Sequence, residues 1–197
     1  MKNRNYYIIN ALTWYRLLAA PVLLVLIFTG QYHIFKWLLP VSFFTDLIDG
    51  TLARKFKVTS VFGSQLDSIG DDLTMLCGII AAFVFKFQFI SEQKIIAGIL
   101  IILLLTQNIL ALIRYRKLSS FHTYLAKIAA ILQGTFLILL FLLPQPVYPL
   151  FYAAAIVSIL DLIEETIMVL MLKEWKADVK GIYWALKIRR RKETSTR

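Results

Sequence analysis

The chain contains very little cysteine and few charged residues. Cys77 is its only cysteine among 197 residues, so no disulfide can form within the chain. Because Cys77 lies in an apolar run, we expect a buried, unreactive thiol. Charged residues make up only 17% of the chain, whereas hydrophobic residues make up 59%. This balance excludes an ordinary soluble domain and indicates a membrane protein with several spans.

Acidic residues are the scarcer charged type. The chain has 12 acidic and 22 basic residues, a net charge of +10, and nine of the basic residues lie in residues 173–197. On a membrane protein, such a basic run is typical of contact with anionic lipid headgroups rather than nucleic acid. The sequence has no repeat, low-complexity segment or second folded domain. We therefore predict a membrane domain over residues 1–172 and a basic cytoplasmic tail over residues 173–197.

Apolar runs predict an all-α fold with six transmembrane helices. The predicted spans are residues 17–29, 34–53, 61–85, 95–113, 124–143 and 147–172. A short interfacial helix is also expected over residues 1–10. With six spans, both termini and the loops at 54–60 and 114–123 share one side, which carries nearly all the loop Lys and Arg. This bias predicts that the termini are cytoplasmic, in a protein of the cell inner membrane.

Two pairs of aspartates lie within these apolar runs. Asp46 and Asp49 are three residues apart near the end of one predicted span, and Asp67 and Asp71 are four apart near the start of the next. On helices, each spacing puts both members of a pair on one face. Asp46 precedes Arg54 by eight residues and Asp71 follows Gly63 by eight, which is roughly 12 Å along each helix. The two pairs are therefore expected at a similar depth, in the half of the membrane nearer the cytoplasm.

Four carboxylates packed in an apolar layer would repel one another and take up protons. Two divalent cations would cancel the four charges, and carboxylate oxygens suit Mg²⁺ or Mn²⁺. Such a pair of cations is able to clamp a pyrophosphate. The small residues Gly50, Ala53 and Gly63 allow a ligand or another helix to approach closely. An alternative of another class is a cation transporter that uses the intramembrane carboxylates as a relay.

These residues together resemble the signature of the CDP-alcohol phosphatidyltransferases. The pattern is Asp-x-x-Asp-Gly-x-x-Ala-Arg-x8-Gly-x-x-x-Asp-x-x-x-Asp, and every fixed position is present. The matching residues are Asp46, Asp49, Gly50, Ala53, Arg54, Gly63, Asp67 and Asp71. The resemblance implies a six-helix membrane enzyme of phospholipid biosynthesis. Such an enzyme transfers the phosphatidyl group of CDP-diacylglycerol to an alcohol and releases CMP.

The resemblance also implies a role for each of these residues. Asp46, Asp49 and Asp67 would be the principal ligands of two Mg²⁺ or Mn²⁺ ions. Asp71 would lie near the second metal and act as the catalytic base. The residues expected to line the cytidine diphosphate pocket are Gly50, Ala53, Arg54 and Gly63. CDP-diacylglycerol, an alcohol acceptor and membrane lipids are the expected partners, and a homodimer is compatible with the sequence.

The acceptor alcohol is predicted from basic residues elsewhere in the chain. Arg114, Arg116 and Lys127 would form an anion site, which suits a polyol phosphate such as glycerol 3-phosphate. The alternative for the two arginines is positive-inside anchoring together with charge pairing to Asp161 or Glu164.

The subfamily cues differ along the chain. The start of the first span resembles phosphatidylglycerophosphate synthases. Ser68, which follows the third aspartate, is closer to phosphatidylserine synthases. Serine, inositol and inositol phosphate are therefore alternative acceptors.

Overall fold

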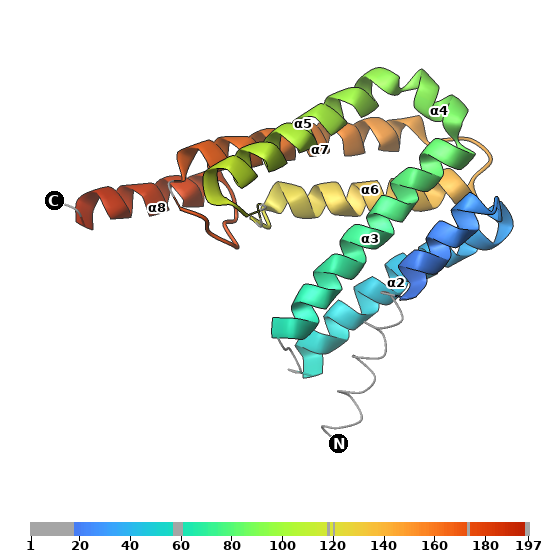
Figure 1. Ribbon diagram of the computed structural model, residues 1–197, viewed down its shortest axis with the longest axis horizontal. Helices are drawn as coiled ribbons and strands as arrows, with labels where there is room; N and C mark the ends of the chain where they lie inside the picture. The colour runs from blue at the N-terminus through green and yellow to red at the C-terminus, as the bar shows by residue number, and fades with distance from the viewer. Residues whose placement is uncertain (1–17, 57–60, 118, 120, 173, 196–197) are drawn as a thin grey trace. The chain divides into compact units, whose positions relative to one another are not determined.

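The computed structural model describes residues 18–56, 61–117, 119, 121–172 and 174–195. Side chains are described within this part except at residues 46–56, 61–69, 71–72 and 189–195. The predicted interfacial helix over residues 1–10 lies outside the described residues. Throughout the described part the regular structure is helical, without strands (Figure 1). The prediction of an all-α fold is confirmed.

The helices follow the predicted spans closely. After a helical segment over Leu18–Phe28, the elements are α2 (Tyr32–Phe56), α3 (Val61–Phe85), α4 (Phe87–Glu92), α5 (Lys94–Tyr115), α6 (Tyr124–Leu142), α7 (Tyr148–Met171) and α8 (Ile182–Ser195). Among these, α5 and α6 are both long and apolar enough to cross a membrane. The presence of six spans stays a prediction. The sequence did not predict the short helix α4 or the helix α8.

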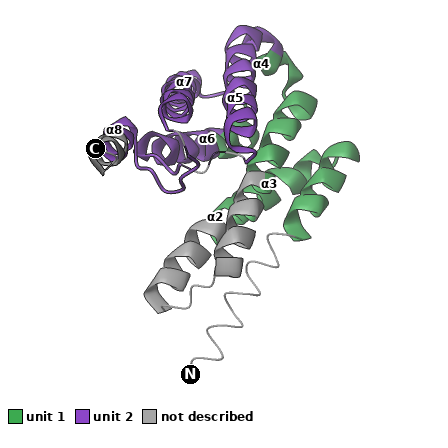
Figure 2. Ribbon diagram, turned by 60° about the vertical axis from the view of Figure 1, so that its left-hand side comes forward, with its two compact units in different colours: residues 1–90, 137–145 green, residues 91–136, 146–197 purple. Residues whose placement is uncertain are grey.

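The chain divides into two compact units, which are described separately (Figure 2). Unit 1 comprises residues 1–90 and 137–145, and unit 2 comprises residues 91–136 and 146–197. Helix α6 belongs to unit 2 over most of its length and to unit 1 at its carboxyl end.

Unit 1 is built around the packing of α2 against α3. Phe35 of α2 is fully buried, and its ring meets Phe85 of α3 and Phe141 of α6. Tyr32 adds a hydrogen bond from its hydroxyl to the Phe141 carbonyl oxygen at 2.7 Å. Cys77 is 2% exposed and its Sγ lies 3.6 Å from the Ala20 carbonyl oxygen. The predicted burial of this thiol is therefore confirmed.

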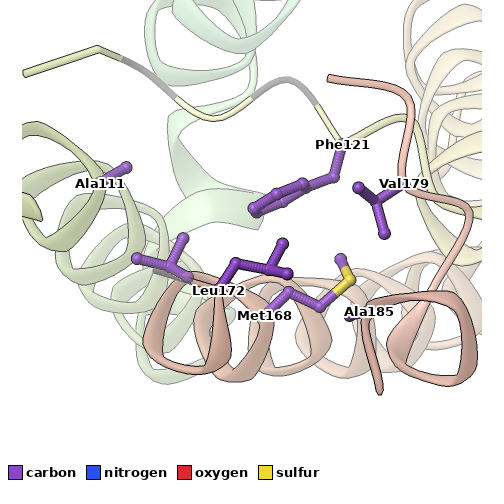
Figure 3. Packing of buried hydrophobic residues seen from close by; sticks show 7 residues of the cluster. Ala111, Phe121, Met168, Leu172, Val179 and Ala185 are labelled. Carbon is purple, nitrogen blue, oxygen red and sulfur yellow. The ribbon is translucent and has the colours of Figure 1, made fainter. Parts of the chain in front are cut away.

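Unit 2 is built around α7, which packs along α5 and against α8. Its apolar core combines residues from α5, α7 and α8, from the loop between α5 and α6, and from the segment between α7 and α8 (Figure 3). The core residues are Ala111, Phe121, Met168, Val169, Leu172, Val179 and Ala185. Because Val179 and Ala185 belong to this core, part of the predicted basic tail is folded against α7.

Candidate functional site

The four predicted metal ligands lie on two helices that pack together. Asp46 and Asp49 are on α2, and Asp67 and Asp71 are on α3, with helical backbone at all four positions. Their side chains lie outside the described part, as do those of Gly50, Ala53, Arg54 and Gly63. The helical backbone that the predicted arrangement requires is present. The assigned roles of the individual residues stay predictions.

Hydroxyl groups that are buried (Ser42, Thr74) or half-buried (Thr45) lie close in sequence to the aspartates on both helices. On α2, Ser42 donates to the Leu38 carbonyl oxygen at 3.1 Å, and Thr45 donates to the Ser42 carbonyl oxygen at 2.9 Å. On α3, Thr74 donates to the Gly70 carbonyl oxygen at 2.9 Å. Because each hydroxyl is satisfied by its own helix, these polar residues are tolerated in an apolar setting.

On each helix, the aspartate positions continue a row of buried residues at helical spacing; this row is called the buried stripe. On α2, Phe35, Leu39 and Ser42 are fully buried at spacings of four and three, and the next steps of four and three reach positions 46 and 49. On α3, Ala81 and Thr74 are buried seven residues apart, and steps of three and four toward the amino end reach positions 71 and 67. Positions at these spacings share one helix face.

The predicted acceptor residues belong to unit 2, whereas the aspartates belong to unit 1. The Arg114 Nε atom donates to the Leu172 carbonyl oxygen at 3.0 Å, next to the end of α7. Cations commonly stabilise such helix ends, so Arg114 has a structural role beside its predicted one. Arg116 adopts a left-handed conformation, with φ of 55°, as it ends α5.

Lys127 lies one turn inside α6, as the sequence predicted. Its side chain is exposed, and its Nζ atom lies 5.9 Å from the centre of the Tyr124 ring. Its backbone N–H donates to the Thr123 carbonyl oxygen at 3.3 Å. The prediction that Arg114, Arg116 and Lys127 bind the acceptor is not tested by these contacts.

Three carboxylates on α7 accept hydrogen bonds from other segments of unit 2. The sequence assigned no function to these residues. Asp161 Oδ1 accepts from the Thr123 hydroxyl at 2.8 Å, and Glu164 Oε1 accepts from the Ile182 N–H at 3.0 Å. Glu165 Oε2 accepts from the Gln107 side-chain amide at 2.8 Å, and the Ser119 hydroxyl lies 3.3 Å away. These donors are uncharged, in contrast to the arginine pairing considered for Asp161 and Glu164.

A local sequence signal was available for one of these contacts. Thr123 directly precedes α6, and its hydroxyl oxygen accepts from the Ala126 N–H at 2.8 Å. A threonine in this position is a typical helix amino-terminal cap. The same hydroxyl donates to Asp161, so the cap also attaches the start of α6 to α7.

The chemistry of the aspartate donor set fits divalent metal. Among the side chains that the structure describes, no three His, Cys, Asp or Glu residues come together in a possible metal site. The two aspartate pairs would offer an all-oxygen donor set from a pair of packed helices. Such donors suit Mg²⁺ or Mn²⁺ better than softer metals.

Comparison with known proteins identifies the family. The family model for CDP-alcohol phosphatidyltransferase matches residues 6–172, which includes the whole aspartate motif. The chain belongs to the CDP-alcohol phosphatidyltransferase family. The resemblance found in the sequence is thereby confirmed. Membership in this family of membrane enzymes, together with the apolar helices α5 and α6, makes the chain a membrane protein.

One curated relative comes from the yeast Schizosaccharomyces pombe (strain 972). It is named a cardiolipin synthase (CMP-forming) / mitochondrial hydrolase fusion protein. Over 115 residues, its sequence is 30% identical to that of the present chain. The matched stretch covers 58% of this chain and 19% of the relative. The chain therefore spans about a fifth of the fusion protein's length. No solved structure gives a significant match.

Proposed function

We propose that the protein is an enzyme of phospholipid biosynthesis. It transfers the phosphatidyl group of CDP-diacylglycerol to an alcohol and releases CMP. The observation that carries this proposal is the complete eight-residue aspartate motif on two packed helices, within the region that matches the family. The CMP-forming activity in the name of the fungal relative supports the same chemistry.

A common face for the four aspartates is part of the proposal. The buried stripes of α2 and α3 continue in register to positions 46, 49, 67 and 71. This supports a site in which Asp46, Asp49, Asp67 and Asp71 hold two Mg²⁺ or Mn²⁺ ions. When bound, the cations supply positive charge that offsets the negative charge developing on the departing CMP.

The reaction proposed for the chain's own residues is a displacement at phosphorus. Asp71 accepts the proton of the acceptor's hydroxyl group. At the same time, the oxygen of that hydroxyl attacks the phosphorus atom nearer the lipid. The new O–P bond replaces the phosphoanhydride bond, and CMP leaves with that bond's electron pair. Gly50 and Gly63 leave room for the cytidine diphosphate group beside the helices, since neither carries a side chain. Ala53 and Arg54 complete the proposed pocket.

The proposed acceptor is a glycerol that carries a phosphate. The predicted anion-binding role of Arg116 and Lys127 favours glycerol 3-phosphate, and Arg114 contributes in addition to its bond to Leu172. The fungal relative favours phosphatidylglycerol, because phosphatidyl transfer to this lipid would produce cardiolipin. Both acceptors carry a glycerol hydroxyl and a phosphate. The same basic residues and the same catalytic base would therefore suit either acceptor. Serine, inositol and inositol phosphate are the remaining alternatives.

An acceptor panel tests this proposal. The purified full chain is incubated with CDP-diacylglycerol labelled in the cytidine, Mg²⁺ and one alcohol at a time, and CMP release is measured. We expect release above the acceptor-free rate with glycerol 3-phosphate or with phosphatidylglycerol. The lipid product, identified by mass spectrometry, separates these two. Equal CMP release with and without every alcohol would contradict the proposal.

The proposed location follows the charge bias of the loops. The active site and both termini face the cytoplasm, in the cell inner membrane. Within unit 2, the start of α6 is attached to the segment after α7, because the Tyr124 N–H donates to the Lys180 carbonyl oxygen at 3.3 Å. This contact supports a common side for the basic loop and the carboxyl-terminal segment. The homodimer stays a prediction.

A further inference from the structure

Helix α8 lies beyond the region that matches the family, which ends at residue 172. It is attached to α7 at its first turn. The Ile182 N–H donates to Glu164 Oε1 at 3.0 Å, and Ala185 is buried in the core of unit 2. A carboxylate at this end of a helix satisfies an exposed N–H group and opposes the positive end of the helix dipole. The orientation of the first turns of α8 on α7 is therefore fixed.

Gly181 allows the chain before α8 to approach the Glu164 carboxylate closely. Its φ is +150°, and a Cβ atom there would lie 2.9 Å from Glu164 Oε1. The position thus needs both the conformational freedom and the small size of glycine. Such a tight fit directly before α8 limits the ways in which the helix can lie on α7.

The first turns of α8 present aromatic and apolar side chains outward. Tyr183 is 66% exposed and Leu186 is 40% exposed, and Trp184 and Lys187 are also exposed. The Trp184 ring lies against the rings of Tyr124 and Tyr183, with centroids 5.7 and 5.4 Å away. Tyr and Trp beside basic residues are typical of helices at the membrane–water boundary.

The remainder of α8 is strongly basic. Arg189, Arg190, Arg191 and Lys192 follow one another within the helix. Four successive cations would complement a surface of negatively charged phospholipid headgroups.

Contacts of α8 with α6 indicate where the helix lies relative to the membrane. Helix α6 is apolar enough to span a membrane and begins at Tyr124. Its first residue donates a hydrogen bond to the Lys180 carbonyl oxygen, two residues before α8 begins. The start of α8 is therefore level with the end of a candidate span, which is where headgroups are found.

We propose that α8 lies on the membrane surface and binds anionic phospholipid headgroups. Tyr183 and Leu186 enter the boundary between headgroups and acyl chains, and the run from Arg189 to Lys192 contacts the phosphates. The aromatic residues and the attachment to a candidate span favour lipid over nucleic acid as the partner of the basic run. This binding does not depend on the proposed transferase activity.

A fluorescence experiment on the full chain tests this inference. A Leu186→Cys variant is labelled with an environment-sensitive dye and placed in nanodiscs of phosphatidylcholine, with or without about one third phosphatidylglycerol. Native Cys77 is buried, so the wild-type chain serves as the labelling control. We expect anionic lipid to shift the emission to the blue and to protect the dye from an aqueous quencher. About 0.5 M salt should weaken the effect through screening.

Neutralising the basic run separates lipid binding from simple proximity to the membrane. In the R189Q/R190Q/R191Q/K192Q variant, the ratio of protected to accessible dye should fall by at least about fivefold, which is the effect of one basic residue at the membrane surface. The Lys94→Gln variant, which changes an exposed lysine at the start of α5, should behave like the parent.

Three results would overturn the proposal. The first is equal protection in neutral and anionic nanodiscs. The second is unchanged protection after the fourfold neutralisation. The third is protection by an added single-stranded RNA in neutral nanodiscs, with no response to anionic lipid, which would assign the basic run to nucleic acid instead.

Discussion

At the scale of single residues, the acids of α7 show how a membrane protein uses half-buried carboxylates for structure. Asp161, Glu164 and Glu165 accept hydrogen bonds from the start of α6, the start of α8 and α5, respectively. Each bond joins segments that are distant in the sequence. A half-buried acid with these partners contributes to the fold of unit 2 without entering the proposed chemistry.

Glu165 provides a stability prediction at this scale. Gln107 is 2% exposed, and its amide donates to Glu165 and to Ser119. The Glu165→Ala substitution removes one acceptor from a buried donor, so we expect a loss of about 1–3 kcal/mol in the free energy of unfolding. Denaturation of the purified chain in detergent measures this loss. Glu165→Gln retains an acceptor oxygen and should cost less; equal losses in both variants would contradict the hydrogen-bond explanation.

Asp71 provides the catalytic prediction. Replacement by asparagine keeps the size of the side chain and removes the base, so kcat should fall by about 10²–10⁴-fold. Asp72→Asn is the matched control, since position 72 lies about 100° further around the same helix. The measurement is the steady-state rate of CMP release for both variants. Wild-type activity in the Asp71→Asn variant would rule out this residue as the base.

The aspartate motif could be recognised from sequence because its residues lie within 26 positions on two successive helices. The contacts of Asp161, Glu164 and Glu165 could not be predicted in the same way. Their partners are 38, 18 and 58 residues away, and only the packing of unit 2 brings them together. An isolated acid in an apolar run indicates that a partner exists and does not identify it.

At the scale of helices, long apolar runs predicted the elements well and polar segments did not. The third predicted span has the same bounds as α3, and the fourth and fifth differ from α5 and α6 by one or two residues. Helix α2 continues through Pro40 and ends at Phe56, beyond the predicted residue 53. Helix α8 was missed because its composition is strongly basic. The packing of α8 on α7 depends on contacts made by Ala185 and Ile182.

The attachment of α8 gives a prediction for a whole element. Glu164→Ala removes the acceptor of the Ile182 N–H, and loss of such a cap costs about 1 kcal/mol. We expect faster hydrogen exchange over residues 182–188 and little change in the middle of α5. Gly181→Ala should produce the same local effect, because its Cβ would press on the Glu164 carboxylate. Unchanged exchange in both variants would contradict the proposed attachment.

At the scale of the whole molecule, α5 offers a test of membrane topology. Its 22 residues extend roughly 33 Å, enough to cross an apolar layer of about 30 Å. Lys94 and Lys117 lie near its opposite ends. The variants Lys94→Cys and Lys117→Cys should therefore react with an impermeant thiol reagent from opposite sides of sealed vesicles. Reaction of both from one side would contradict a span at α5.

The central claim is that the aspartate motif performs phosphatidyl transfer rather than cation transport. Proteoliposomes that contain the full chain, CDP-diacylglycerol and an effective acceptor allow both activities to be measured together. We predict CMP release that stops when a chelator removes the divalent metal, returns with added Mg²⁺ or Mn²⁺, and is strongly reduced in the Asp71→Asn variant. Divalent-cation or proton flux that depends on the aspartates, without any CMP release, would contradict the claim.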